Sequence, residues 1–192
     1  MSDSPALSDA LTPGLISSRE IHRGRVITVA EELVRFPDGS TGALDIVHHP
    51  GASAVLPVLG AMDSEDPAIL LIRQYRHAAG TWLLEVPAGR LDSGESADAC
   101  AHRELREETG CTATQMLPLT TILTTPGFSN ERIHLFIATG LSRGDAKREA
   151  DEFIEPMTLS LSDALEKVRV GEITDAKTVI TLLYAAGYNL GR

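Results

Sequence analysis

Residues 89–111 read GRLDSGESADACAHRELREETGC, and this stretch determines how the rest of the chain is interpreted. Between positions 96 and 109 there is no Gly or Pro, and Ala and Glu are frequent, which favours a helix. Gly110 follows at the place where a helix C-terminus favours a left-handed residue. Gly89 and Gly94 permit a sharp loop before the helix. The stretch therefore predicts a loop followed by one helix.

The predicted helix carries a group of glutamates. Glu104 and Glu108 are four residues apart and share a face, while Glu107 lies on the adjoining flank. Like charges at this spacing repel by a few tenths of a kcal/mol per pair. A hard dication bound by carboxylate oxygens would offset the repulsion. The alternative is a solvated acidic face with Arg103 and Arg106 as ordinary ion-pair partners.

The spacing of the fixed positions favours the metal site. In order, the pattern is Gly89, five residues, Glu95, seven residues, Arg103-Glu104-Leu105, one residue, Glu107-Glu108, one residue, Gly110. This pattern resembles the Nudix box at every fixed position. The last position, usually aliphatic, is Cys111, which packs as a small hydrophobe. The resemblance implies an α+β fold, an α/β/α sandwich with a mixed sheet.

The resemblance also implies a magnesium-dependent pyrophosphohydrolase and assigns roles to the residues of the box. Mg²⁺, for which Mn²⁺ can substitute, would neutralise a diphosphate and lower the pKa of a bound water. Two or more ions at ~3.5 to 4 Å would clamp the attacking and leaving oxygens. The expected metal ligands are Glu104, Glu108, Glu107 and a backbone carbonyl near Ala88. Arg103 is expected to hold carboxylates in place, together with Glu95.

A second group of motifs resembles the ADP-ribose pyrophosphatase subgroup. Pro126 stands sixteen residues beyond Gly110, within TTPGFSNERIHLF, although an ordinary turn explains this proline equally well by itself. RQYRHAAGTWLLEVPAGRLD, DEFIE and GEITDAKT are also similar, so the resemblance covers residues 46–185. It implies hydrolysis of ADP-ribose to AMP and ribose 5-phosphate. Hydrolysis of another nucleoside diphosphate sugar such as GDP-mannose, or non-catalytic sensing of ADP-ribose, are the alternatives.

Candidate substrate contacts lie on both sides of the box. Arg76 is the candidate phosphate clamp because guanidinium is a planar bidentate donor, and a surface arginine with a local partner is the alternative. The resemblance places Glu85 near the metal or substrate, whereas a glutamate at a strand end could simply face solvent. Pro126 and Phe128 are further candidates for substrate binding. Trp82 and Tyr75 are, like Phe128, candidates for stacking a base or for the core.

Members of the subgroup commonly take one further carboxylate from a loop outside the box. Glu152, within EADEFIE, matches that position best, and it is the expected residue for activating water. Its neighbours Glu149 and Asp151 stay open as alternatives. A solvated charged loop is the non-functional interpretation of the same residues.

The remaining elements follow from composition and turn signals. Residues 16–49 predict short antiparallel strands around a turn at residues 37–39, and four more strands are predicted within residues 53–141 besides the one that enters the box. A strand at 153–160 precedes two helices, one capped by Ser162 and the other by Thr174 or Asp175. The order lacks the βαβ regularity of a doubly wound fold. We expect a leader (1–12), an N-terminal β layer (13–50) and a catalytic domain (51–192), and the layer resembles one exchanged across a homodimer.

Composition limits the partners and the compartment. Net charge is −10 and no basic run exists, which argues against a duplex nucleic-acid binder. No apolar run approaches the ~18 residues of a membrane helix, and residues 1–12 lack the features of a secretory signal. Cys100 and Cys111 are too far apart along a helix, at ~1.5 Å per residue, to form a disulfide. Small buried thiols in a reducing compartment, and hence a cytoplasmic protein, are expected.

Overall fold

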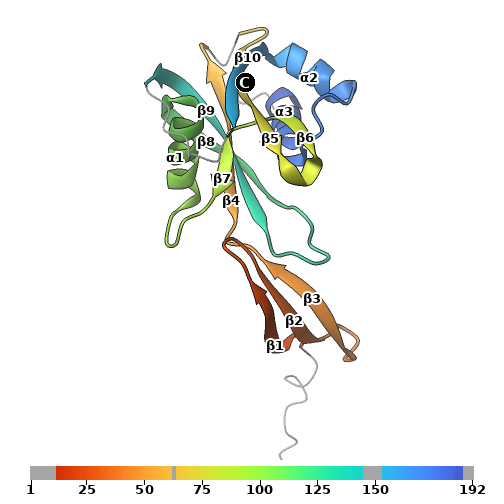
Figure 1. Ribbon diagram of the computed structural model, residues 1–192. Helices are drawn as coiled ribbons and strands as arrows, with labels where there is room; N and C mark the ends of the chain where they lie inside the picture. The colour runs from red at the N-terminus through yellow and green to blue at the C-terminus, as the bar shows by residue number, and fades with distance from the viewer. Residues whose placement is uncertain (1–11, 62–63, 145–152, 188–192) are drawn as a thin grey trace, which may run out of the picture. The chain divides into compact units, whose positions relative to one another are not determined.

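The computed structural model describes residues 12–61, 64–144 and 153–187 (Figure 1). The chain divides into two compact units. The first unit comprises Met1–Pro50 and Leu123–Glu131, and the second comprises Gly51–Ile122 and Arg132–Arg192.

The first unit is built on a three-stranded antiparallel sheet in the order β1-β2-β3. Its strands are β1 (Gly14–Arg23), β2 (Thr28–Arg35) and β3 (Thr41–His48). The predicted turn between β2 and β3 is present, because Gly39 has a φ of 85° and its N–H donates to the carbonyl of Phe36. Asp38 accepts a hydrogen bond of 2.9 Å from the backbone N–H of Ser40, which stabilises the same turn.

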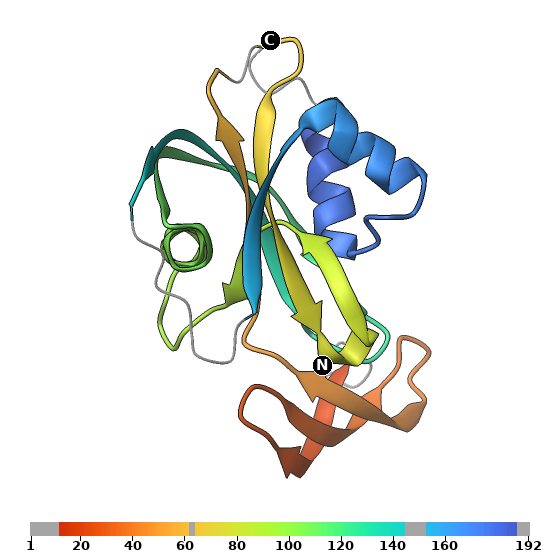
Figure 2. The same ribbon diagram turned by 45° about the horizontal axis from the view of Figure 1, so that its top comes forward.

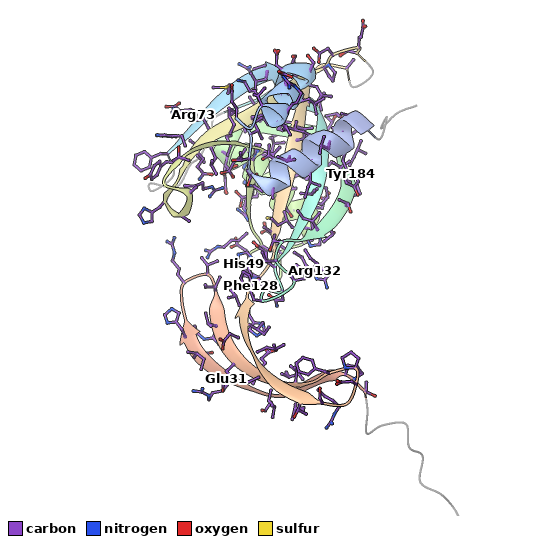
Figure 3. All side chains as sticks on the ribbon, turned by 90° about the vertical axis from the view of Figure 1, so that its right-hand side faces the viewer. Glu31, His49, Arg73, Phe128, Arg132 and Tyr184 are labelled. Carbon is purple, nitrogen blue, oxygen red and sulfur yellow. The ribbon has the colours of Figure 1, made fainter. Side chains whose placement is uncertain are left out.

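The loop Leu123–Glu131 belongs to this first unit, although the sequence placed it within the catalytic region. Its backbone explains the difference, because the carbonyl of Phe128 accepts a 2.7 Å hydrogen bond from the N–H of Val47 at the end of β3. The side-chain oxygen of Asn130 accepts from the N–H of His49 at 2.8 Å. Figure 3 shows His49 and Phe128 in this region of the first unit.

The second unit contains a mixed sheet with seven strands among the described residues. The main order is β10-β5-β4-β9-β8, with β6 paired to β5 and β7 paired to β4. β4 and β9 are parallel, whereas β4 is antiparallel to β5 and β7, and β5 to β6 and β10. The strands are β4 (Ala52–Leu59), β5 (Ala68–Arg76), β6 (Thr81–Glu85), β7 (Ala88–Arg90), β8 (Cys111–Leu123), β9 (Arg132–Arg143) and β10 (Ile154–Ser160).

Helices cover both faces of this sheet. Figure 2 shows α1 (Ala97–Thr109) on one side and α2 (Leu161–Arg169) with α3 (Ala176–Gly187) on the other. The central strand β4 is buried on both faces: Val55 packs in the cluster with Leu105 of α1, and Leu56 in the cluster with Leu182 of α3. The predicted α+β fold, an α/β/α sandwich with a mixed sheet, is therefore confirmed.

Helix ends agree with the sequence prediction at α1 but not at α2. Ser96 accepts a hydrogen bond from the N–H of Ala99 at 3.2 Å, and Gly110 ends α1 with a φ of 72°. The prediction that Ser162 caps α2 is wrong, because Ser160 accepts the capping bond from Asp163. Ser162 lies inside the first turn, where its N–H and hydroxyl both donate to Asp66.

The strand β7 was not expected, since three residues after a proline give little local signal. It forms because the chain leaving β6 returns antiparallel to β4, with Ala88 opposite Ala54 and Arg90 opposite Ala52. This pairing fixes the start of the box loop against the centre of the sheet. The short 3-10 helix η1 (His77–Ala79) connects β5 to β6.

Candidate active site

Arg103 of α1 joins the loop before the helix to the helix itself. Its Nε and Nη2 atoms donate to the two carboxylate oxygens of Glu95, both at 2.9 Å, and Nη2 also donates to the carbonyl of Arg90 at 2.9 Å. These hydrogen bonds from Arg103 lower the pKa of Glu95 to about 2. The same pairing raises the pKa of Arg103. The pairing of Arg103 with Glu95 that the sequence indicated is present.

The same guanidinium also bridges the carboxylates of α1. Its Nη1 atom lies 2.5 Å from Oε1 of Glu104 and 3.1 Å from Oε2 of Glu107. One cation therefore holds three acidic side chains that would otherwise repel one another. Arg103 contacts these carboxylates, and its roles in orienting them and in catalysis stay predictions.

The helix face that carries Glu104 and Glu108 is buried against the box loop. Glu104 is 7% exposed and Glu108 2% exposed. The backbone N–H of Ala88 donates to Oε2 of Glu108 at 2.9 Å. A Cβ atom added to Gly89 would lie 2.0 Å from Oε1 of Glu104. Position 89 thus requires glycine, because a Cβ atom there would collide with the Glu104 carboxylate. Gly94 has a φ of 79° and provides the left-handed turn.

These residues fit a divalent cation by the chemistry of their donors. Within the part of the chain that the structure describes, no three Asp, Glu, His or Cys side chains converge on one metal position, and Arg103 is the cation between Glu104 and Glu107. The donors are nevertheless all carboxylate oxygens, which hard dications prefer. Two of them sit on a buried face, where negative charge requires compensation. Glu104, Glu108 and Glu107 would hold such an ion.

Arg76 and Glu85 form a second charged group in the same unit. The Nε and Nη2 atoms of Arg76 donate to the two oxygens of Glu85, both at 2.8 Å. Glu85 is 1% exposed, so the alternative of a glutamate facing solvent is wrong. Arg76 does have a local partner, but it is a buried one.

Lys177 completes this group, although it was not among the expected site residues. Its Nζ atom donates to Oε2 of Glu85 and lies 3.0 Å from Oδ1 of Asp175. Burial alone would raise the pKa of Glu85, but the hydrogen bonds from Arg76 and the charge of Lys177 outweigh it and lower that pKa. The GEITDAKT motif, noted only as a similarity, was the signal that could have pointed to Lys177.

The remaining candidates lie in the first unit, on the β5–β6 hairpin or outside the described residues. Pro126 and Phe128 belong to the first unit, where the Phe128 side chain is 53% exposed. Tyr75 and Trp82 pack edge to face at 5.8 Å on the β5–β6 hairpin, where both are partly exposed and neither is in the core. Glu152, Glu149 and Asp151 lie outside the described residues. The roles of these last three residues are therefore supported by the sequence pattern alone.

The two cysteines are free and buried, as the sequence indicated. Among the described residues, no helix is long and apolar enough to cross a membrane.

Comparison with known proteins identifies the family. A model described as the NUDIX domain matches residues 48–179. The chain belongs to the Nudix family. It is 40% identical over 171 residues to a protein named ADP-ribose pyrophosphatase from Bacillus subtilis strain 168, covering 88% of this chain and 90% of that one. It is 41% identical over 132 residues to a protein named GDP-mannose pyrophosphatase from Cronobacter sakazakii, covering 62% of this chain and 66% of that one.

A solved structure shares the fold of this Nudix chain. The crystal structure of an ADP compounds hydrolase superposes with a TM-score of 0.76, covering 92% of this chain and 93% of that one at 22% sequence identity. This similarity supports the α/β/α sandwich. As a Nudix hydrolase the chain belongs to enzymes that act with divalent metal ions, in agreement with the carboxylate donors on α1.

Proposed function

We propose that this Nudix hydrolase cleaves the pyrophosphate bond of ADP-ribose to give AMP and ribose 5-phosphate, using Mg²⁺. The observation that carries the proposal is the buried carboxylate face of α1, organised by Arg103. The hydrogen bonds to Glu85 raise the pKa of Arg76, and the charge of Glu108 contributes to the same shift. A cationic donor thus lies within electrostatic reach of the metal-binding face.

Each residue has a distinct part in the proposed reaction. A divalent cation bound by Glu104, Glu108 and Glu107 supplies charge neutralisation and a water of lowered pKa. Arg103 keeps the carboxylates of α1 in register. Arg76 binds a phosphate group of the substrate and orients the diphosphate for attack. We further propose a carbonyl near Ala88 as a metal ligand, two or more ions in the site, and Mn²⁺ as a substitute.

Residues outside this group complete the proposal. Glu152 is proposed as the carboxylate that activates water, with Glu149 and Asp151 as the neighbours to be compared. Glu85 acts on the substrate through Arg76. Pro126 and Phe128 are proposed to contact the nucleotide, because Pro126 stands at the offset from the box that the ADP-ribose pyrophosphatase subgroup has.

The relative named ADP-ribose pyrophosphatase, similar over most of both chains, supports this substrate. The relative named GDP-mannose pyrophosphatase favours a second candidate, hydrolysis of GDP-mannose, by the same chemistry with a different sugar and base. Both candidates use the same carboxylates and the same phosphate-binding arginine. They differ in the pocket for the base and the distal sugar.

A substrate panel tests the proposal. The purified protein is incubated with Mg²⁺ and either ADP-ribose, GDP-mannose, UDP-glucose, NADH or a dinucleoside polyphosphate, and products are separated by chromatography. We expect ADP-ribose to be cleaved most efficiently, with AMP as a product, and EDTA to abolish turnover. Preference for GDP-mannose would replace the first candidate by the second. Binding of ADP-ribose without cleavage of any substrate would replace both by a sensor.

The three-stranded sheet of the first unit is proposed to form a homodimer. Its strands expose several large apolar side chains, and packing against a second copy would remove apolar surface from water: they are Leu15, Ile16, Ile21, Leu33 and Leu44. Light scattering during gel filtration should give about twice 20.6 kDa, and a mass of 20.6 kDa alone would exclude the dimer.

A cytoplasmic location is proposed from the two free cysteines, and cell fractionation would test it.

A further inference from the structure

We propose that Lys177 is a positioning residue that acts through Glu85 to present Arg76 to a diphosphate. The inference rests on the proposed function and extends it, because nothing in the Nudix box involves α3. Lys177 and Glu85 are 92 positions apart in the sequence, yet Nζ of Lys177 donates to Oε2 of Glu85 in a buried contact. That oxygen also accepts from Nη2 of Arg76.

The β5–β6 hairpin places Arg76 and Glu85 on one face. Ile72 is opposite Glu85 and Arg76 is opposite Thr81 in the antiparallel register. Opposite residues share a face, and alternate residues along a strand also share it, so Arg76 lies on the face of Glu85. The arginine side chain therefore runs back along the hairpin to reach the glutamate.

The geometry of the Arg76–Glu85 pair leaves one edge of the guanidinium for a ligand. Arginine has five N–H donors in a planar fork. The edge formed by Nε and Nη2 is used by Glu85 at 2.8 Å on both sides. The other edge, Nη1 with the second N–H of Nη2, donates to no group among the described residues, and the side chain is 39% exposed. This edge has the bidentate shape that phosphate oxygens fit.

Lys177 controls how much positive charge that edge presents. A buried carboxylate with Arg76 as its single cation would neutralise the guanidinium that should attract phosphate. Lys177, whose side chain is 11% exposed, shares the negative charge of Glu85. Oδ1 of Asp175 lies 3.0 Å from Nζ of Lys177, and its negative charge offsets the positive charge of the lysine. The four side chains sum to zero charge, and the exposed cationic end of the group is Arg76.

The start of α3 also fixes the backbone beside Glu85. The Oδ2 atom of Asp175 accepts from the N–H of Thr178 at 3.0 Å and from its hydroxyl at 2.6 Å. The same hydroxyl oxygen accepts from the N–H of Val86 at 2.9 Å. Glu85 is therefore held by its own side chain and by the next peptide unit. Rotation of its carboxylate would break the hydrogen bond from Lys177 of α3, so the orientation of Arg76 depends on an element that is distant in the sequence.

A double-mutant cycle tests the positioning role in the full-length protein. The variants are Lys177→Met, Arg76→Met and the combination, with Lys167→Met as the matched control because Lys167 forms an exposed ion pair with Glu172. Two quantities are measured with Mg²⁺ present: KM and kcat for ADP-ribose, and the affinity for inorganic pyrophosphate by calorimetry. Melting temperatures show whether each variant is folded, and Lys177→Gln replaces Lys177→Met should the latter fail to fold.

We expect Lys177→Met to raise KM and weaken pyrophosphate binding by about tenfold, with a smaller change in kcat. In the Arg76→Met background, Lys177→Met should change KM and pyrophosphate affinity no further, because the arginine through which Lys177 acts is absent. Lys177→Arg should retain pyrophosphate binding, since a guanidinium can also donate to the carboxylates of Glu85 and Asp175. Lys167→Met should match the unaltered protein.

Two results would overturn the proposal. The first is an undiminished effect of Lys177→Met in the Arg76→Met background, which would mean direct contact with the ligand or a general structural role. The second is a lower melting temperature with unchanged KM and pyrophosphate affinity. Failure of the unaltered protein to cleave ADP-ribose would instead remove the proposed function, and coupling between the two residues in pyrophosphate affinity would still decide the positioning role.

Discussion

Gly89 lies so close to Glu104 that a Cβ atom on the glycine would stand 2.0 Å from Oε1 of the glutamate. The same oxygen is 2.5 Å from Nη1 of Arg103, so the carboxylate has no room to retreat without losing its ion pair. Gly89→Ala should therefore displace Glu104 and reduce kcat/KM by about 100-fold, as a misplacement of about 1 Å does. Steady-state kinetics with Mg²⁺ and ADP-ribose measure this loss.

Gly187→Ala is the matched control for that substitution. Gly187 ends α3, and a Cβ atom there would have no neighbour within 4 Å. We expect unchanged activity. Full activity in Gly89→Ala would show that Glu104 can move without consequence, and its assignment as a metal ligand would fail.

Glu108→Gln should leave the protein folded and nearly inactive. The glutamine retains an oxygen that can accept the hydrogen bond from the N–H of Ala88, which is 2.9 Å from the carboxylate. It removes the negative charge that a divalent cation needs. We expect turnover to fall by at least about 100-fold, because even residues that only support metal ligands are worth about 10- to 100-fold. Activity and circular dichroism are measured together.

Glu166→Gln controls for the loss of a carboxylate elsewhere on a helix. Glu166 pairs with Arg169 on the surface of α2. Its substitution should not alter turnover or the Mg²⁺ concentration that gives half-maximal rate. Normal turnover in Glu108→Gln at low Mg²⁺ would contradict the proposed metal site.

Local signals were sufficient to predict α1 and both of its ends. Gly110 ends α1 with a φ of 72°, and Ser96 caps it, because both effects act within one helical turn. The cap of α2 was misassigned because Ser162 is bound by Asp66, 96 positions away. A hydrogen bond over that separation has no trace in the local pattern. β7 was missed for the same reason, since its pairing with β4 is its main support.

In the candidate site, too, the contacts within one helix were predictable from the sequence and the contacts between distant elements were not. The carboxylates of α1 and their contact with Arg103 follow from spacing on one helix, and the sequence predicted them. The buried partnership of Glu85 with Lys177 joins β6 to α3, and no periodicity connects the two. Pairing with a buried carboxylate over that distance depends on how the sheet and α3 pack.

The Glu95–Arg103 pair should make stability depend on pH. The hydrogen bonds from Arg103 lower the pKa of Glu95 from 4.5 to about 2 in the folded protein. A depressed folded pKa contributes stability above the unfolded value, and this contribution disappears as pH falls from 4.5 towards 2. The free energy of unfolding in urea should therefore differ between the unaltered protein and Glu95→Gln. This difference should be largest at about pH 6 and smallest at about pH 2. A difference that stays constant across this range would refute the assigned pairing.

The thiol of Cys100 should be almost unreactive in the folded protein. Burial raises its pKa to about 11, and its S–H donates to the carbonyls of Gly89 and Arg90 at 3.5 and 3.4 Å. At pH 8 only about one thiol in a thousand would be ionised, and the thiolate is the form that reacts. Mass spectrometry after iodoacetamide treatment should show no modification at Cys100 in buffer and full modification in guanidinium. Because the two carbonyls belong to β7, rapid labelling in buffer would mean that β7 separates from α1.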